Sequence, residues 1–385
     1  MSNYFFTYLL SAKYSNMPIY MDRHDVSETV TAENVAELHQ ADLKIQKQFR
    51  CTGLTYWFDE KRKTAFCLIE APNKMAIQKM HNHAHGQVAN SIIEVSTGIV
   101  ESFLGRIQDP EKTNDTVLNI INDPAFRTIM VIRLKQPALL PNSSSGLKAF
   151  LQNFNDKVVK LLKNHEGTSV KQAKNYWLVS FKLVSNAVSA ARKIQLLFKD
   201  LKKDIKDSML TLKIGLSAGA PVTDKKSFFE DPIKLAERMS EFIKGEIIVS
   251  LEVKELYDSE NPVALSEEEN IISLSQSDEN FLTLLMDYTE SVWRNSNLRV
   301  DDFSKPVMCS KSQLYRKIIS LMGKSPNSFI REYRLNEALL LLDKKAGNIS
   351  DVSFETGFSS PSYFSKCFQK RFGVMPSDYC PANVV

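Results

Sequence analysis

The chain has 385 residues, 43% of them hydrophobic and 24% charged, which is ordinary for a globular protein of two or three domains. Its net charge of +4 is only mildly basic, so bulk charge alone gives weak support for nucleic-acid binding. The five cysteines form no Cys-x-x-Cys pair, which favours reduced thiols over a disulfide framework. No apolar run is long enough to span a bilayer, and we expect a cytoplasmic protein that makes no membrane contact.

Residues 1–16 precede a much cleaner pattern that begins at Met17. The apolar run 4–10 within them lacks the basic start of a signal peptide and is too short for one. We expect a flexible extension here, and the sequence leaves open whether translation starts at Met1 or at Met17.

The first predicted domain covers residues 17–105 and alternates strands with helices. Thr31 is placed to cap a helix over 32–49, and Gly86 is placed to end a second helix over 72–85. The other segments have strand patterns, over 17–26, 55–58, 65–69 and 92–103. The resulting order β-α-β-β-α-β predicts a ferredoxin-like α+β sandwich.

Most of the histidines lie in this domain, namely His24, His39, His81, His83 and His85. His81 and His85 are four residues apart on the predicted helix, a spacing that lets two imidazoles bind one metal ion. In the same way, His39, Asp42 and Gln46 line one face of the first helix. These five histidines are the candidate ligands of a transition metal, with nickel or zinc as candidates. The alternatives are hydrogen-bonded surface histidines, a pocket for a small organic molecule, and a pH sensor.

The same domain resembles a small family of ferredoxin-like proteins, some of which bind nickel. The stretches that carry the resemblance are 17–24, 56–60, 66–72 and 83–86, and together they sample nearly the whole domain. The resemblance implies the fold and is compatible with a nickel site. Because members of such families often pair, it also implies a homodimer.

A polar linker is predicted over 106–125, and a second domain follows over 127–274. Its expected strands and helices again alternate, with strands over 128–134, 210–218 and 247–249, a hairpin over 167–181, and helices over 147–164, 187–201 and 232–243. Residues 137–146 are predicted to be a loop, and the acidic stretch 266–270 a surface turn or a boundary.

The hairpin 167–181 and the stretches 212–222, 231–239 and 245–250 resemble the class III nucleotidyl cyclases. The resemblance implies a second α+β domain with a cyclase-like fold. An unrelated α+β domain is the alternative.

The chemistry of that family needs two carboxylates that hold two metal ions on the triphosphate. Arg133 stands where the family has its first Asp, and Lys174 and Asn175 replace its Gly-Asp pair. Lys234 replaces the Asn that assists the transition state, and Arg238 alone matches. The resemblance therefore implies a catalytically inactive domain that binds a nucleotide, pairs with another copy or acts as a spacer.

The third predicted domain, residues 279–385, has no strand pattern. Helices are expected over 281–293, from 298 onward, over 311–319 after a Ser310 cap, and over 329–342, and another helix-turn-helix begins at 348. An α-helix fits the major groove of DNA when it offers short polar or basic side chains outward and an apolar face to its scaffold. The helix after Ser310 and the helix within 357–372 both meet that condition.

Residues 357–376, with a Gly-Phe turn, Phe364, Phe368, Gly373 and Pro376, resemble the second helix-turn-helix of the AraC/XylS transcription regulators. With the first unit, the resemblance covers roughly 280–381. It implies groove-facing residues in both units, namely Ser312, Gln313 and Arg316 in the first, and Ser360, Ser362 and Lys366 in the second. Lys317, Arg331 and Arg334 are further candidates by their charge and their place on the helices. The alternative is that all of these are simply a solvated face.

The sequence thus predicts two α+β domains followed by an all-α double helix-turn-helix domain. The predicted function is sequence-specific regulation of transcription, with duplex DNA, a second copy of the chain and an unknown small ligand as partners. Two other classes are kept as alternatives: a nucleotidyl cyclase with a DNA-binding tail, and a metal-buffering protein.

Overall fold

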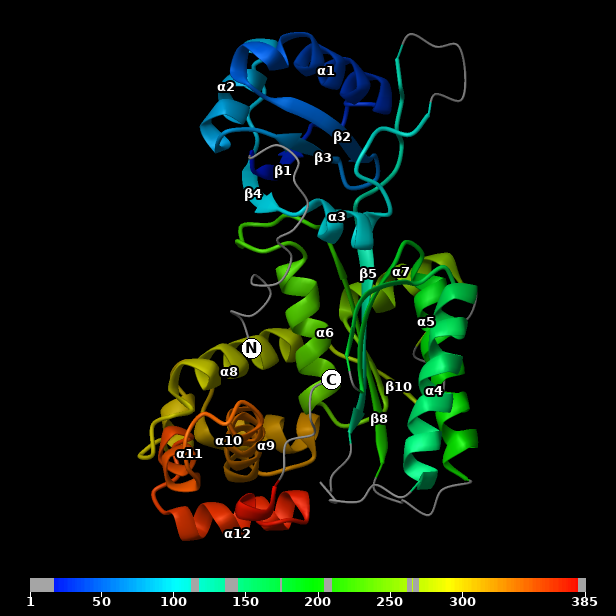
Figure 1. Cartoon of the computed structure of the whole chain (residues 1–385). Coiled ribbons are helices and arrows are strands. Elements are labelled where there is room, and N and C mark those ends of the chain that lie inside the picture. The colour runs from blue at the N-terminus through cyan, green and yellow to red at the C-terminus, as the bar shows by residue number, and fades with distance from the viewer. Residues whose placement is uncertain are drawn as a thin grey trace. The chain divides into compact units, whose positions relative to one another are not determined.

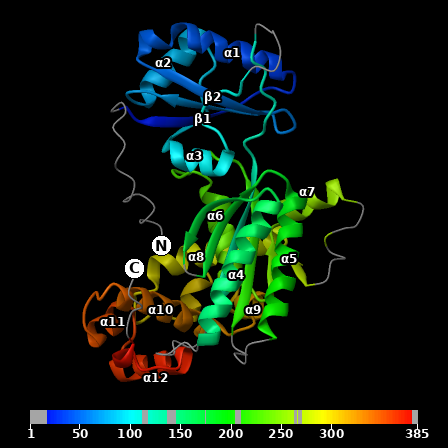
Figure 2. The same ribbon diagram turned by 45° about the vertical axis from the view of Figure 1, so that its right-hand side comes forward.

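The computed structural model describes residues 17–111, 118–135, 145–173, 175–203, 210–261, 265 and 270–379 (Figures 1 and 2). The described residues belong to two compact units. The N-terminal unit contains those up to Ala125 together with Ala220–Phe229, and the C-terminal unit contains the rest. The predictions for 1–16, for Lys174 and for most of 137–146 and 266–270 lie outside the described residues.

The N-terminal unit is built on a four-stranded antiparallel sheet in the order β2-β3-β1-β4. Helices α1 and α2 lie on the same side of this sheet (Figure 1). The element bounds are β1 Ile19–Asp25, α1 Ala32–Ile45, β2 Thr52–Asp59, β3 Thr64–Glu70, α2 Lys74–Ala84 and β4 Ser91–Val95. The predicted cap is confirmed, because the Thr31 hydroxyl accepts the backbone N–H of Asn34 at the start of α1. The order and pairing confirm the ferredoxin-like sandwich.

The prediction of a single strand over 92–103 is wrong beyond residue 95. A helix, α3 (Thr97–Leu104), follows β4 immediately. The side chain of Ser96 accepts the N–H of Ile99, and Gly105 ends the helix at a φ of 82°. The apolar run conceals this helix, because short buried strands and short buried helices look alike in sequence.

The predicted linker 106–125 is packed against the sheet in its described parts. The hydroxyl of Tyr56 donates to the carbonyl oxygen of Asn119 at 2.8 Å and accepts the N–H of Ile121 at 2.8 Å. The guanidinium of Arg106 lies 4.4 Å from the ring centre of Trp57. Because these contacts bury Ile121, the segment is part of the N-terminal unit.

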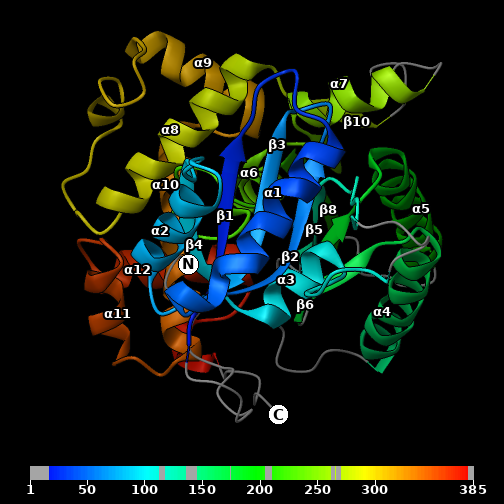
Figure 3. The same cartoon turned by 90° about the horizontal axis from the view of Figure 1, so that it is seen from above.

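The C-terminal unit contains a six-stranded sheet in the order β10-β9-β8-β5-β7-β6. Helices α4 and α5 lie side by side on one face, and α6 covers the other (Figures 1 and 3). The bounds are β5 Arg127–Lys135, α4 Ser145–Asn164, β6 Thr168–Ala173, β7 Tyr176–Phe181, α5 Val184–Lys202, β8 Thr211–Gly219, α6 Glu230–Phe242, β9 Ile247–Val249, α7 Leu251–Glu260 and β10 Ile271–Ser273. Helix α7 and strand β10 were not predicted. The first four strands, in the order β8-β5-β7-β6, repeat the arrangement of the N-terminal sheet.

Helix α6 lies unusually close to the sheet. A Cβ atom on Gly215 of β8 would lie 2.2 Å from the carbonyl oxygen of Ala236. A side chain at position 215 therefore has no space, and the glycine sets the distance between α6 and β8.

The rest of the C-terminal unit is helical, as predicted: α8 Gln276–Val292, α9 Lys311–Met322, α10 Pro326–Asp343, α11 Ile349–Glu355 and α12 Pro361–Phe372. The helix expected from residue 298 is only a 3₁₀ turn, Val300–Phe303. The first helix-turn-helix shares one apolar core with α6, which contains Met239 of α6 together with Phe281 and Phe329. The second has a core of its own around Phe364 and Phe368.

Candidate nucleic-acid interface and histidine cluster

Helix α9 is fixed at both ends. The Ser310 hydroxyl accepts the N–H of Gln313, and the Gln313 side-chain oxygen accepts the N–H of Ser310 at 2.9 Å. Gly323 ends the helix at a φ of 69°. Buried Leu314 and Ile318 then leave the opposite face exposed. Of the predicted groove residues, Ser312, Gln313 and Arg316 lie on that exposed face.

The other three basic candidates of the first unit have partners inside the protein. The ammonium of Lys317 donates to the Ser277 hydroxyl at 2.9 Å. The guanidinium of Arg334 donates to the carbonyl oxygens of Trp293, at 2.8 Å, and Asn295, at 2.6 Å. Arg331 donates to the hydroxyl of Ser328, on its own helix. Lys317 and Arg334 therefore hold α8 and the turn after it against α9 and α10.

Helix α12 has the same construction as α9. The Ser360 hydroxyl accepts the N–H of Tyr363, so Ser360 is the cap of the helix. Ser362 and Lys366 are exposed, as predicted, and so is the ring of Tyr363. The turn before the helix requires Gly357, whose φ is 77° and whose Cβ would lie 2.7 Å from the carbonyl oxygen of Trp293.

At the centre of the histidine cluster is the fully buried ring of His81. Its Nε2 lies 2.8 Å from Asp22 Oδ2, and its Nδ1 lies 3.0 Å from Asp42 Oδ2. A carboxylate only accepts hydrogen bonds, so each ring nitrogen carries a proton and the ring is an imidazolium. Burial opposes this charge, but the hydrogen bonds to the two carboxylates outweigh burial and raise the pKa of His81 to about 10. His24, and then His81, lower the pKa of Asp22 despite its burial.

The five histidines do not converge on one point. His85 joins His81 at Asp42, with Nε2 3.4 Å from a carboxylate oxygen. His39 lies elsewhere, 3.5 Å from Asp109. His83 is exposed and lies beside the ring of Phe49.

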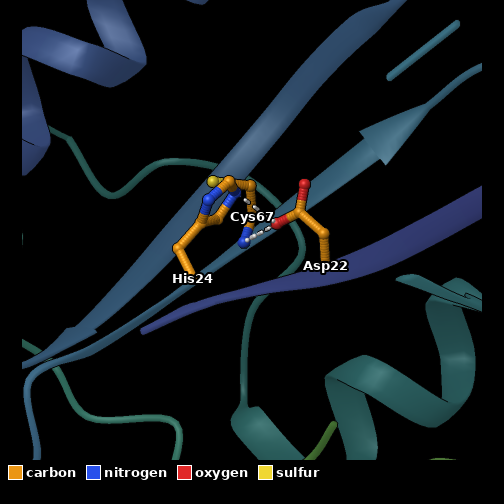
Figure 4. Close-up of side chains that lie close together, drawn as sticks. All are labelled: Asp22, His24 and Cys67. Atoms are coloured by element: carbon orange, nitrogen blue, oxygen red, sulfur yellow. Dashed lines mark hydrogen bonds and ion pairs between the residues drawn. The ribbon is translucent and has the colours of Figure 1, made fainter. Parts of the chain in front are cut away.

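His24 forms a second small cluster with Asp22 and Cys67 (Figure 4). Its Nε2 lies 3.4 Å from Asp22 Oδ1, and that oxygen also accepts the backbone N–H of Cys67 at 2.9 Å. Burial raises the pKa of the Cys67 thiol well above its usual value. The cluster therefore offers a carboxylate, an imidazole and a protonated thiol.

Among the residues that the structure describes, two sets of three side chains place one ligand atom each within 4.8 Å of one another, namely Asp22, His24 and Cys67, and Asp42, His81 and His85. In the second set, both nitrogens of His81 already face carboxylates. In the first, the buried Nε2 of His24 has no hydrogen-bond partner. A buried nitrogen whose polar contact is a 3.4 Å ion pair with Asp22, and which lies beside oxygen and sulfur donors, fits a borderline metal such as nickel or zinc.

Sequence reasoning identified the histidines but missed Asp22 and Cys67. The available signal was a charged residue in the middle of a run that is otherwise typical of a buried strand.

At three of the positions that were compared with the cyclases, the chain has a basic side chain that pairs with other residues of the same protein. Arg133 donates to the Ser240 hydroxyl at 3.2 Å and lies over the ring of Tyr176. Lys234 pairs with Glu230 at 2.6 Å. The buried guanidinium of Arg238 lies 2.5 Å from Asp287 and 3.0 Å from Glu290, both on α8. Arg238 therefore links the middle domain to the helical domain.

Two family models match the chain. Residues 20–95 match the family described as nickel responsive protein SCO4226-like, and residues 304–380 match a helix-turn-helix domain family. The C-terminal domain is of the AraC type. This confirms the predicted helix-turn-helix domain, and the first match confirms the family proposed for the N-terminal domain.

Some relatives match a single domain of the chain, and another matches nearly all of it. The HTH-type regulator YdeC of Bacillus subtilis, itself uncharacterized, is 31% identical over 86 residues, which are 22% of this chain and 30% of YdeC. Histidine kinase P4 of Formosa agariphila is 25% identical over 360 residues, 90% of this chain and 24% of that protein. The crystal structure of SCO4226 from Streptomyces coelicolor is 34% identical and covers 20% of this chain and 94% of that chain, with a TM-score of 0.19. The chain thus spans only 24 to 30% of the length of the first curated relatives it matches.

The described helices include none that combines the length and the apolar character needed to cross a membrane.

Proposed function

We propose that this protein is a transcription regulator that binds duplex DNA through α9 and α12. The observation that carries the proposal is the AraC-type domain, in which two capped helices on one connecting helix each keep a polar face exposed. Two such helices would enter neighbouring major-groove turns on one side of the duplex. In this arrangement the exposed side chains of Ser312, Arg316, Ser362 and Lys366 would contact DNA.

The test is genome-wide mapping of the DNA bound by the full chain, followed by binding measurements on the recovered fragments. We expect the mapping to recover a small set of promoter fragments that share a sequence motif. The affinity for unrelated DNA should be at least about 1,000-fold weaker than the affinity for these fragments. A folded full chain that binds all fragments alike would contradict the proposal.

We also propose that the N-terminal domain senses nickel or zinc. The proposed ligands are Asp22, His24 and Cys67, supported by their mutual proximity, by the buried Nε2 of His24, which makes no hydrogen bond and lies 3.4 Å from Asp22, and by the family match. A bound ion would add a charged link between β1 and β3. Regulation would then follow by linkage, because a metal shifts the protein toward a DNA-competent state only by its difference in affinity between states.

Metal content and titration of the purified protein test this site. His24→Ala should abolish stoichiometric binding, whereas His83→Ala removes an exposed imidazole from the same domain and should leave it unchanged. Cys67→Ser checks the site with a smaller change in shape. Equal metal content in His24→Ala, Cys67→Ser and the parent protein would rule out these ligands.

The middle domain is proposed to be catalytically inactive, since Arg133 and Lys234 stand at positions where the cyclases place catalytic groups. Incubation with ATP or GTP and Mn²⁺ should give no cyclic nucleotide, and turnover would favour the cyclase alternative instead.

We further propose a homodimer that acts in the cytoplasm. Sedimentation of the full chain tests the dimer.

A further inference from the structure

A cavity of about 400 Å³ lies inside the C-terminal unit, where the middle domain meets the helical domain. Its walls come from both sheet and helices. The charged residues are Lys135 at the end of β5, Lys213 on β8, Glu241 on α6, Lys324 after α9, Glu332 on α10 and Arg371 on α12. The cavity thus touches both helix-turn-helix units and the cyclase-like sheet.

Positive charge is in excess around this cavity. Counting Lys244, five cationic side chains line it against two carboxylates, a net charge of +3. Lys135 pairs with Glu241 at 3.0 Å and Lys324 with Glu332 at 2.5 Å, which uses both carboxylates. Among the described residues, no carboxylate lies within ion-pair distance of Lys213, Lys244 or Arg371.

The charged form of two of the ammonium groups is disfavoured, mainly by burial and further by neighbouring cations. Burial is the main cause that lowers the pKa of Lys135, to about 8, and Arg133 and Lys213 add to the shift. Burial, and then Lys324, lowers the pKa of Lys213. The ammonium of Lys213 is held by the carbonyl oxygens of Ile243, at 3.1 Å, and Gly245. An anion in the cavity would relieve the repulsion and favour the charged form of both lysines.

We propose that this cavity binds a small molecule with a diphosphate group. Its volume is that of a small-molecule site, and its position between two domains is typical of one. A single phosphate carries about −1.5 to −2 charges at pH 7, so two adjacent phosphates are needed to neutralise an excess of three. Lysine and arginine are the side chains that proteins use for this recognition.

Binding would add polar contacts to the apolar core that already joins the two domains. Around the cavity they are joined by few polar contacts, among them the Lys244 N–H to the Leu321 carbonyl oxygen at 2.8 Å and Asn336 to Glu241 at 3.3 Å. A diphosphate that contacts Lys213 and Arg371 together would tie β8 to α12. The consequence for promoter binding rests on the proposed function above, but the binding itself does not.

Calorimetric titration of the full chain with inorganic pyrophosphate, without DNA, tests the proposal. Arg371→Gln should weaken binding by about tenfold or more. Lys370→Gln removes the same charge from the neighbouring, exposed position of α12, and should change binding less than about twofold. Lys213→Met should weaken binding in the same way as Arg371→Gln.

Absence of pyrophosphate binding to the parent chain would overturn the proposal, and so would equal losses in Arg371→Gln and Lys370→Gln. If Arg371→Gln weakens only DNA binding and leaves pyrophosphate binding intact, the cavity serves the DNA backbone and the proposal fails. Tighter binding of ADP than of pyrophosphate would support it and identify a nucleotide as the source of the diphosphate. Failure of promoter binding alone leaves the calorimetric result unaffected.

Discussion

The buried ring of His81 is stabilised by two carboxylates that come from distant parts of the sequence. We expect Asp22→Asn to destabilise the N-terminal unit by about 3 kcal/mol, because it leaves a buried imidazolium with a single anion. Hydrogen exchange of the β1 and β3 amides, measured with a chelator present, reports this change. Asp25→Asn is the control on the same strand. Its exposed pair with Arg23 is worth about 0–1 kcal/mol, so similar effects of the two variants would contradict the role of Asp22.

The exposed guanidinium of Arg316 is the best test of the groove-facing side of α9. Arg316→Ala should weaken binding to a specific promoter site by about 1–3 kcal/mol if the side chain contacts a base pair. A phosphate contact would instead lower the affinity for all sequences. It would also reduce the slope of log affinity against log salt concentration by about one. Lys203→Ala removes one charge outside the helical domain and controls for bulk electrostatics. Equal behaviour of the two variants on all DNA would place α9 outside the groove.

At the scale of elements, the packing of α6 on the sheet depends on a single missing side chain. Gly215→Ala would place a Cβ 2.2 Å from the Ala236 carbonyl oxygen, and backbone on both sides has to move. We expect a loss of about 3 kcal/mol in the stability of the C-terminal unit, measured by urea unfolding. Gly98→Ala, in α3, meets nothing within 4 Å and should be neutral or stabilising by up to about 1 kcal/mol. A neutral Gly215→Ala would mean that α6 shifts freely.

Elements with local signals were predictable from the sequence. Caps such as Thr31 and Ser310 determine where their helices begin, and period-two alternation indicates the strands. Helix α3 and the 3₁₀ turn at Val300 were misjudged, because apolar content outweighed the weaker signals of a cap or a short turn. Strand β10 has only three residues and depends on its pairing with β9, a contact that no local pattern reveals.

The candidate sites divide in the same way. Exposure of Ser312 and Arg316 follows from helical periodicity within α9, so the sequence was enough. The partners of His81 were out of reach, since Asp22 lies 59 residues away and comes into contact only through the order of the strands. Lys317 and Arg334 were assigned to DNA by their charge and their place on the helices. Their contacts with α8 and the turn after it depend on tertiary packing.

At the scale of the whole molecule, four strands of the C-terminal sheet repeat the order of the N-terminal sheet, and within the C-terminal unit the sheet layer is joined to the helical domain. The two parts are connected through a shared apolar core and not only through a linker. The ring of Phe242, on α6, lies 5.6 Å from the ring of Phe329 and 6.1 Å from that of Tyr333, both on α10. The first helix-turn-helix is therefore expected to unfold together with α6, whereas the second has a core of its own.

Phe242→Ala tests this coupling. The half-buried ring contributes about 2 kcal/mol by packing, and its loss should reduce hydrogen-exchange protection in α6, α8 and α10 together. Protection in the N-terminal sheet should stay the same, because it belongs to the other compact unit. Phe354→Ala removes a ring on α11 that is already largely exposed, and should have little effect. Loss of protection confined to α6 would show that the helical domain is independently stable, and a signal from the middle domain would then have to reach the DNA-binding helices by another route.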